Sequence, residues 1–167
     1  MNIYQQIEKR INVECILIDK VIDRALLAWA EAGKNPDVQS LYLDSVALNL
    51  HGFYTGIERL FELIARHIDE SVPSDKNWHR SLLKQMTENY KNYRPAVISQ
   101  SIFFELDEFR RFRHVVRNVS FRQACLTCGL SISQARLPKG DDRPFFARRR
   151  TAVRLYKIRY NIIRINL

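Results

Sequence analysis

The chain has 167 residues, of which 46% are hydrophobic and 27% are charged. These values suit one compact domain and exclude a low-complexity or collagen-like chain, since glycine and proline number only five each. No charge-free stretch approaches the roughly 20 residues of a membrane-spanning helix, and charged side chains interrupt residues 1–16, where a signal peptide would be apolar. We therefore expect a cytoplasmic protein with no membrane partner.

The net charge of +9 is distributed very unevenly along the chain. Residues 1–120 contain 16 basic and 16 acidic residues, whereas residues 121–167 contain 11 basic residues and two acidic ones. The first part of the chain is therefore neutral overall, and the whole surplus lies in the last part.

The three cysteines give no zinc-binding pattern. Cys125 and Cys128 form a CxxC motif, but there is no second pair, and the histidines lie far upstream without ligand spacing. We expect reduced thiols and neither a metal nor another cofactor.

Apolar periodicity predicts long helices at the start of the chain. The first runs from about residue 2 to 31, and Gly33 ends it. The second opens with Asn35 as N-cap and Pro36 as first helical residue, and it continues to about residue 69.

The second helix also carries a sign of close helix packing. Gly52 and Gly56 lie four residues apart, so a neighbouring helix could approach closely there. The apolar face of this helix is expected at Val38, Leu41, Leu48, Ile57, Leu60 and Ile64.

Two further helices complete the first 120 residues. Ser74 can cap a short third helix, and Ser99 can cap a fourth that carries residues 106–120. No strand alternation competes with this pattern. We therefore predict an all-α fold, a bundle of four to five helices.

The stretch LDEFRRFRHVVRNVS at residues 106–120 concentrates four arginines and one histidine. Leu106, Phe109 and Val116 form a core-facing stripe, and Arg113 lies on that same stripe. A guanidinium stays charged, so at such a position it needs an acceptor, an interface or a ligand.

Helical neighbours separate these arginines into two groups. Asp107 can reach Arg110 and Arg111, which we interpret as ordinary surface pairs. Arg113 and Arg117 have no carboxylate one turn upstream, and phosphate is a natural anion for two such side chains.

Two segments resemble the HEPN-domain toxins, in particular HepT-like proteins whose partner is an MNT-type nucleotidyltransferase antitoxin. They are LYLDSVALNLHGFYTGIERLFELIARHID at residues 41–69 and FRRFRHVVRN at 109–118, with the pair Trp78-His79 between them. The resemblance covers about residues 1–119. It implies a helical bundle that dimerises and cuts RNA without a metal at an R-x4-6-H motif in the dimer cleft.

The resemblance also implies roles for individual residues. Arg113 matches the motif arginine, which would stabilise charge on the phosphate, and His114 matches the polar residue after it. Asn118 stands in place of the motif histidine, and Ser120 in place of a tyrosine that the antitoxin adenylylates in some members. The arginines expected to bind RNA phosphates are Arg110 and Arg117.

The two replacements leave enzymatic activity open. Asn118 cannot act as a general acid or base, so His114 is the nearby imidazole left for that role. His51, His67 and His79 are expected to be surface or partner-satisfied histidines. Three functions therefore remain: a ribonuclease toxin, an impaired HEPN-like dimer that only binds a partner or RNA, and an RNA-binding protein that uses the basic tail.

The sequence predicts a boundary at residue 119. Residues 1–119 form the HEPN-like bundle, and residues 120–167 form a basic, atypical extension. A reading-frame shift near Val119 would explain why composition and resemblance change together, and an unselected extension is the simpler interpretation of the tail.

Overall fold

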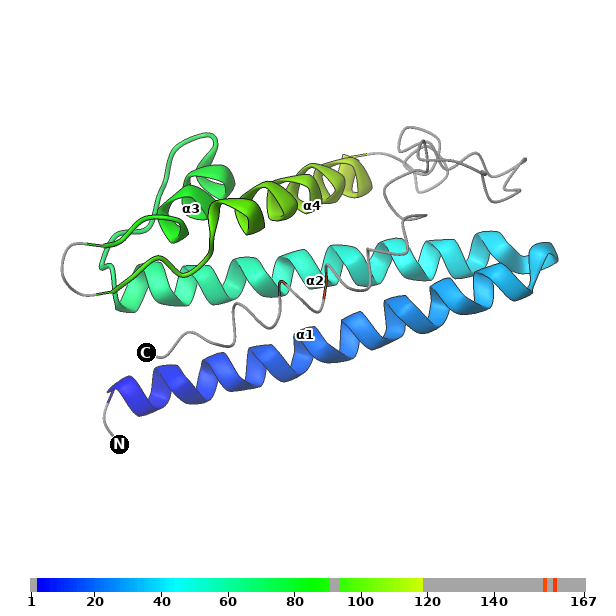
Figure 1. Ribbon diagram of the computed structural model, residues 1–167, viewed down its shortest axis with the longest axis horizontal. Coiled ribbons are helices and arrows are strands. Elements are labelled where there is room, and N and C mark those ends of the chain that lie inside the picture. Colours follow the sequence, from blue (N-terminus) through cyan, green and yellow to red (C-terminus); the bar gives the residue numbers. More distant parts are fainter. Residues whose placement is uncertain (1–2, 91–93, 119–154, 156–157, 159–167) are drawn as a thin grey trace.

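The computed structural model is an all-α bundle, as the sequence predicts (Figure 1). It describes residues 3–90, 94–118, 155 and 158, with only the backbone described for residues 3, 4 and 114–118. The helices are α1 (Ile3–Lys34), α2 (Gln39–His67), α3 (Trp78–Met86) and α4 (Gln100–Asn118), with a short 3-10 helix at Pro36–Val38.

Helices α1 and α2 run antiparallel and lie side by side (Figure 1). The two helices approach each other closely at Gly56, because a Cβ atom there would be 2.7 Å from Ile18 Cγ1 and 3.3 Å from Glu14 Oε1. The expected packing role is confirmed for Gly56. At Gly52 an added Cβ would make only an ordinary contact, 3.6 Å from Val21 Cγ1.

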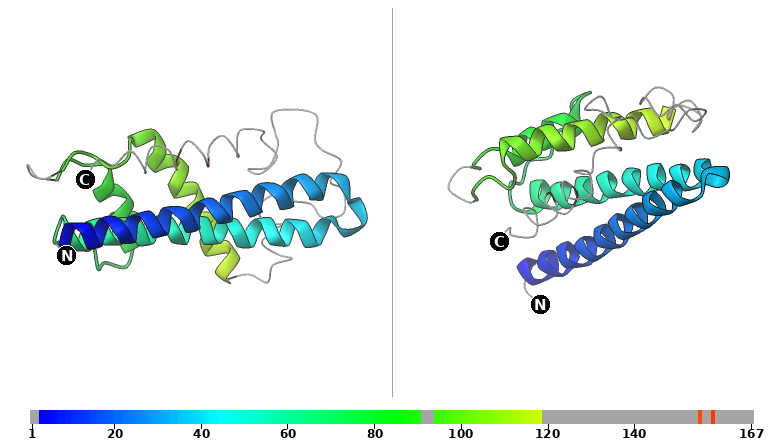
Figure 2. Two further views of the ribbon diagram at one scale, coloured as in Figure 1. Left: turned by 90° about the horizontal axis from the view of Figure 1, so that it is seen from below. Right: turned by 45° about the vertical axis from the view of Figure 1, so that its right-hand side comes forward.

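Helix α2 is the centre of the bundle. Helices α3 and α4 pack against it on the side away from α1 (Figure 2). Phe53 of α2 and Phe109 of α4 meet edge to face, with ring centroids 5.2 Å apart. Two late residues, Leu155 and Ile158, are also buried in this core. The predicted division at residue 119 stays a prediction, since residues 119–154 lie outside the described part.

The helix ends correct two expectations and confirm a third. Asn35 does not cap α2, because its Nδ2 donates backwards to the carbonyl of Glu31 in α1 (3.1 Å). Ser74 does not cap α3, which begins only at residue 78. Ser99 does cap α4, since its Oγ accepts a hydrogen bond from the backbone N–H of Ile102 (3.4 Å).

The expected apolar face of α2 is right in its second half and wrong in its first. Ile57, Leu60 and Ile64 are buried, but Leu41 and Leu48 are exposed. Two apolar stripes run along the start of α2, and helical periodicity alone does not tell which of them faces α1. The buried stripe consists of Leu43, Val46, Ala47 and Leu50.

A buried ion pair holds the segment between α3 and α4 against the end of α2. Arg94 donates through Nε and Nη2 to the two oxygens of Asp69, at 2.6 and 2.5 Å, and the side chains are 3% and 0% exposed. Gln85 donates to Asp69 at 2.6 Å, and Arg94 also donates to the carbonyls of Glu88 and Pro95 at 3.1 Å each. Every charged group here has several partners, as a buried pair requires.

Candidate functional site

Arg113 finds its acceptors on α2 rather than on its own helix. Its Nε donates to Thr55 Oγ1 at 3.3 Å, and its Nη2 lies 3.4 Å from Glu58 Oε2. The Thr55 hydroxyl is oriented by its own bond to the carbonyl of His51 (2.9 Å). The Arg113 side chain stays 17% exposed, so the guanidinium is held in place but remains accessible.

Glu58 links this arginine to an imidazole. Its side chain is buried; Oε2 faces Arg113 and Oε1 accepts a hydrogen bond from Nδ1 of His79. His79 lies in the first turn of α3 and stacks on Trp78, with ring centroids 3.6 Å apart. The bridging carboxylate therefore holds a guanidinium from α4 and an imidazole from α3 in one cluster, which we call the Glu58 cluster: Thr55, Glu58, Trp78, His79 and Arg113.

Glu58 is the residue that sequence reasoning missed. His79 does have a partner, as expected of a satisfied histidine, but that partner is the carboxylate that also faces Arg113. The sequence does contain a pattern that indicates Glu58, because this residue continues the buried stripe of Leu50 and Tyr54 on α2 at a spacing of four. Glu58 is an acidic residue on a core-facing stripe of α2, and Arg113 is a basic residue on a core-facing stripe of α4. Two such opposite charges are expected to pair, because an unpaired charge is costly to bury.

Tyr54 adds a phenol one turn before Glu58. It is buried, and its hydroxyl has no hydrogen-bond partner within the described part of the chain. Burial raises the pKa of the Tyr54 phenol, and the negative charge of Glu58 raises it further, against smaller opposite effects of Arg110 and Arg113. The hydroxyl therefore keeps its proton near neutral pH and can donate it in a hydrogen bond.

Asp107 pairs with Arg110 and Arg111 as expected, but these are not ordinary surface pairs, because the Asp107 side chain is only 4% exposed. Arg110 Nε and Arg111 Nη2 each lie 2.7 Å from an oxygen of Asp107, whose side chain is buried. Burial raises the pKa of the Asp107 carboxyl, but the hydrogen bonds and charges of the two arginines outweigh this and lower it overall. Arg110 is thus already paired, and its expected contact with RNA phosphate stays a prediction.

Residues 45–126 match a family model described as HepT-like protein. Over these residues, just under half of the chain, the protein is HepT-like. The match includes every residue of the Glu58 cluster and extends a few residues beyond the expected limit near residue 119. No curated protein and no solved structure matches the chain. Within the described ranges of this HepT-like protein, none of the helices has the length and apolar character to cross a membrane.

The rest of the HepT-like motif is only partly described. His114, Arg117 and Asn118 lie on α4, but their side chains are outside the described part, as is all of Ser120. The α4 helix continues unbroken to Asn118. Five residues of helix place Asn118 about 140° around the axis from Arg113, so the two do not share a face within one HepT-like chain. The roles expected for these residues stay predictions.

Cys15 forms no disulfide within the described part of this HepT-like chain, and the expected reduced state of the other two cysteines stays a prediction. Cys125 and Cys128 lie outside the described residues. Among the residues that the structure does describe, His, Cys, Asp and Glu side chains form no group of three that could hold a metal ion.

Proposed function

We propose that this HepT-like protein is the toxin of a HEPN/MNT toxin-antitoxin pair and cleaves cytoplasmic RNA as a metal-independent endoribonuclease. The observation that supports this proposal is the Glu58 carboxylate, which faces Arg113 on one side and binds His79 on the other. Arg113 is the residue that matches the family's motif arginine. The cluster thus combines an anion-binding group with a proton-transfer group.

The proposed reaction is attack of a ribose 2′-oxygen on the adjacent phosphorus. The bond from the 2′-oxygen to phosphorus forms, the bond to the 5′-oxygen breaks, and negative charge develops on the phosphoryl oxygens. The Arg113 guanidinium stabilises that charge. The 2′-hydroxyl proton passes to a general base, and the resulting acid returns a proton to the departing 5′-oxygen.

We propose His79 for the proton transfer that Asn118 cannot perform. Its Nδ1 is held by Glu58, which leaves Nε2 for the substrate, and the side chain is 27% exposed. A carboxylate on one ring nitrogen fixes the tautomer and stabilises the imidazolium that forms when the other nitrogen accepts a proton. His114 remains the alternative. Substituting each histidine in turn and measuring RNA cleavage distinguishes which of them transfers the proton.

We further propose that the protein forms a homodimer and binds an MNT-type antitoxin. Exposed apolar side chains on the two long helices support a partner surface, because a partner that covers such side chains removes apolar area from water. Their exposed fractions range from 45% to 66%, and the residues are Val13, Ile16, Leu17 and Leu27 of α1 with Leu41 and Leu48 of α2.

The decisive experiment is cleavage of single-stranded RNA by the purified full chain in a chelator. We expect the wild type to cut, and Arg113→Ala to lose activity by about 100-fold or more, since it removes the group that stabilises the transition state. The matched control is Arg111→Ala, whose side chain is 69% exposed and pairs with Asp107. Cutting by Arg113→Ala at the wild-type rate would remove Arg113 from the mechanism.

A second candidate function is an impaired HEPN-like dimer that only binds its partner or RNA. The observation in its favour is that Arg113 already has two partners, Thr55 and Glu58, and is mostly buried. In that case the wild type makes no cut in the same assay, and Arg113→Ala changes stability alone.

A further inference from the structure

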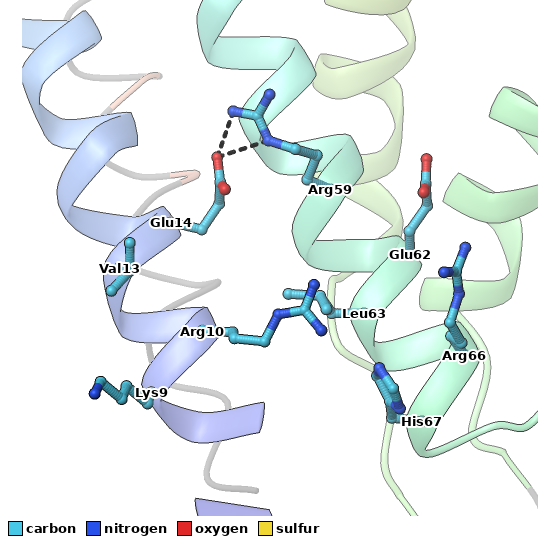
Figure 3. Close-up of a pocket in the computed structure, with 9 residues that line it drawn as sticks. All are labelled: Lys9, Arg10, Val13, Glu14, Arg59, Glu62, Leu63, Arg66 and His67. Atoms are coloured by element: carbon cyan, nitrogen blue, oxygen red, sulfur yellow. Dashed lines mark hydrogen bonds and ion pairs between the residues drawn. The ribbon is translucent and has the colours of Figure 1, made fainter. Parts of the chain in front are cut away.

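A second charged feature lies on a neighbouring face of α2, between the beginning of α1 and the end of α2 (Figure 3). It is a groove of about 450 Å³. Its apolar lining residues are Val13 of α1 and Leu63 of α2, and charged side chains of both helices surround them. The basic ones are Lys9, Arg10, Arg59, Arg66 and His67.

The charges around this groove do not balance. Arg59 is neutralised, because its Nε and Nη2 lie 3.0 and 2.5 Å from Oε1 of Glu14 (Figure 3). Lys9, Arg10 and Arg66 form no hydrogen bond or ion pair with any residue in the described ranges. Of the two carboxylates in the lining, Glu62 alone remains to offset these three cations.

This surplus is local, because residues 1–120 as a whole carry equal numbers of basic and acidic side chains. In Figure 3 the Arg10 side chain extends from α1 towards α2, and Arg66 comes from α2 itself. Free cations that two helices bring to one hollow form a site for an extended anion.

We propose that this α1/α2 groove binds the phosphodiester backbone of RNA at a distance from the cleavage centre. The lining contains no Phe, Tyr or Trp on which a base could stack, so it would recognise backbone charge rather than sequence. This inference rests on the proposed ribonuclease function and adds a substrate-binding surface to it.

The position of the groove fits a role in binding rather than in chemistry. Glu58 points to α3 and α4, whereas the next residue, Arg59, points to α1. Consecutive helical residues are about 100° apart, so the groove and the Glu58 cluster lie on neighbouring faces of α2. Loss of the groove cations should therefore raise the KM for RNA and leave kcat unchanged.

The test uses the full chain and a fluorescent single-stranded RNA of about 20 nucleotides, with anisotropy measured over a series of salt concentrations. The double variant Arg10→Gln/Arg66→Gln should weaken binding about tenfold. It should also reduce the slope of log K against log salt by about 1.4, since each lost phosphate contact on a single strand contributes roughly 0.7.

The matched control is Lys20→Gln/Arg24→Gln. It removes the same charge from exposed positions of α1 that do not line the groove. We expect a much smaller change in binding and slope. An equal loss in the two double variants would overturn the proposal, because net charge would then explain the effect.

The two proposals fail in distinguishable ways. If Arg113→Ala cuts like the wild type while the groove variant binds RNA weakly, the cleavage mechanism fails and the groove is supported. If Arg113→Ala is inactive while the groove variant binds like the wild type, the groove proposal is wrong and the function stands.

Discussion

Two of the arginine–carboxylate pairs in the described part of the chain join residues 58–69 to later segments, and they differ in how completely their polar atoms are hydrogen-bonded. Arg94 makes two bonds of 2.5 to 2.6 Å to Asp69 and further bonds to backbone carbonyls, and both side chains are almost fully buried. Arg113 approaches Glu58 through one 3.4 Å contact and remains partly accessible.

The difference separates a structural pair from a candidate site. A guanidinium whose donors are all used cannot bind a further anion without breaking bonds in a dry environment. Arg113 keeps donor capacity, and its carboxylate partner is shared with His79. Incomplete satisfaction, rather than the presence of an ion pair, is what makes the Glu58 cluster suitable for a ligand.

The largest loss of stability is expected from breaking the fully buried Arg94–Asp69 pair. Arg94→Met should lower the free energy of unfolding by about 3 to 5 kcal/mol, since it leaves the buried Asp69 carboxylate without its main partner. Chemical denaturation of the full chain measures it. If the free energy of unfolding fell by less than about 1 kcal/mol, the Arg94–Asp69 pair would not be the structural pair that its burial and hydrogen bonds indicate.

The same substitution at the partly accessible Arg113–Glu58 pair should lower stability less. Arg113→Met should lower the free energy of unfolding by roughly 1 to 2 kcal/mol, because Glu58 keeps its hydrogen bond to His79. Its main effect should appear in RNA cleavage. A stability loss equal to that of Arg94→Met, with cleavage retained, would make Arg113 a structural residue.

The smallest effect concerns Asp107, whose carboxylate is buried while its partner Arg111 is exposed. Its pKa is lowered in the folded state, so its stabilisation is present above about pH 4 and is lost as pH falls through the lowered value. Asp107→Asn should cost about 1 kcal/mol at pH 7 and clearly less near pH 2.

Denaturation of the wild type and Asp107→Asn at the two pH values checks this prediction. Asp44→Asn, at an exposed position of α2, is the control and should show little difference at either pH. A stability difference for Asp107→Asn that is the same at both pH values would exclude titration of Asp107 as its cause.

Much of the fold could be predicted from the sequence because it depends on local patterns. The stripe of Leu106 and Phe109, the close approach at Gly56 and the cap at Ser99 are each encoded within a few residues. The site could be predicted only in part. Arg113 was found because it interrupts an apolar stripe, but its pairing with Glu58, 55 positions earlier, depends on how α2 and α4 pack.

Sequence periodicity predicted the wrong buried face for the first half of α2 because two apolar stripes fit the helical period there. Leu41 and Leu48 fit a helical stripe as well as the buried residues beside them do, and only the position of α1 decides which stripe is covered. The pairing of His79 with Glu58 was missed for a similar reason, since Glu58 lies on another helix.

The burial of Leu155 and Ile158 has a consequence for synthesis of the chain. These core residues leave the ribosome after the four described helices have been translated, so the nascent bundle lacks two of its buried apolar side chains until late in elongation. The order of translation therefore delays completion of the hydrophobic core to which α2, α3 and α4 contribute. For a protein proposed to cleave RNA, this delay would keep the unfinished chain inactive during its own synthesis.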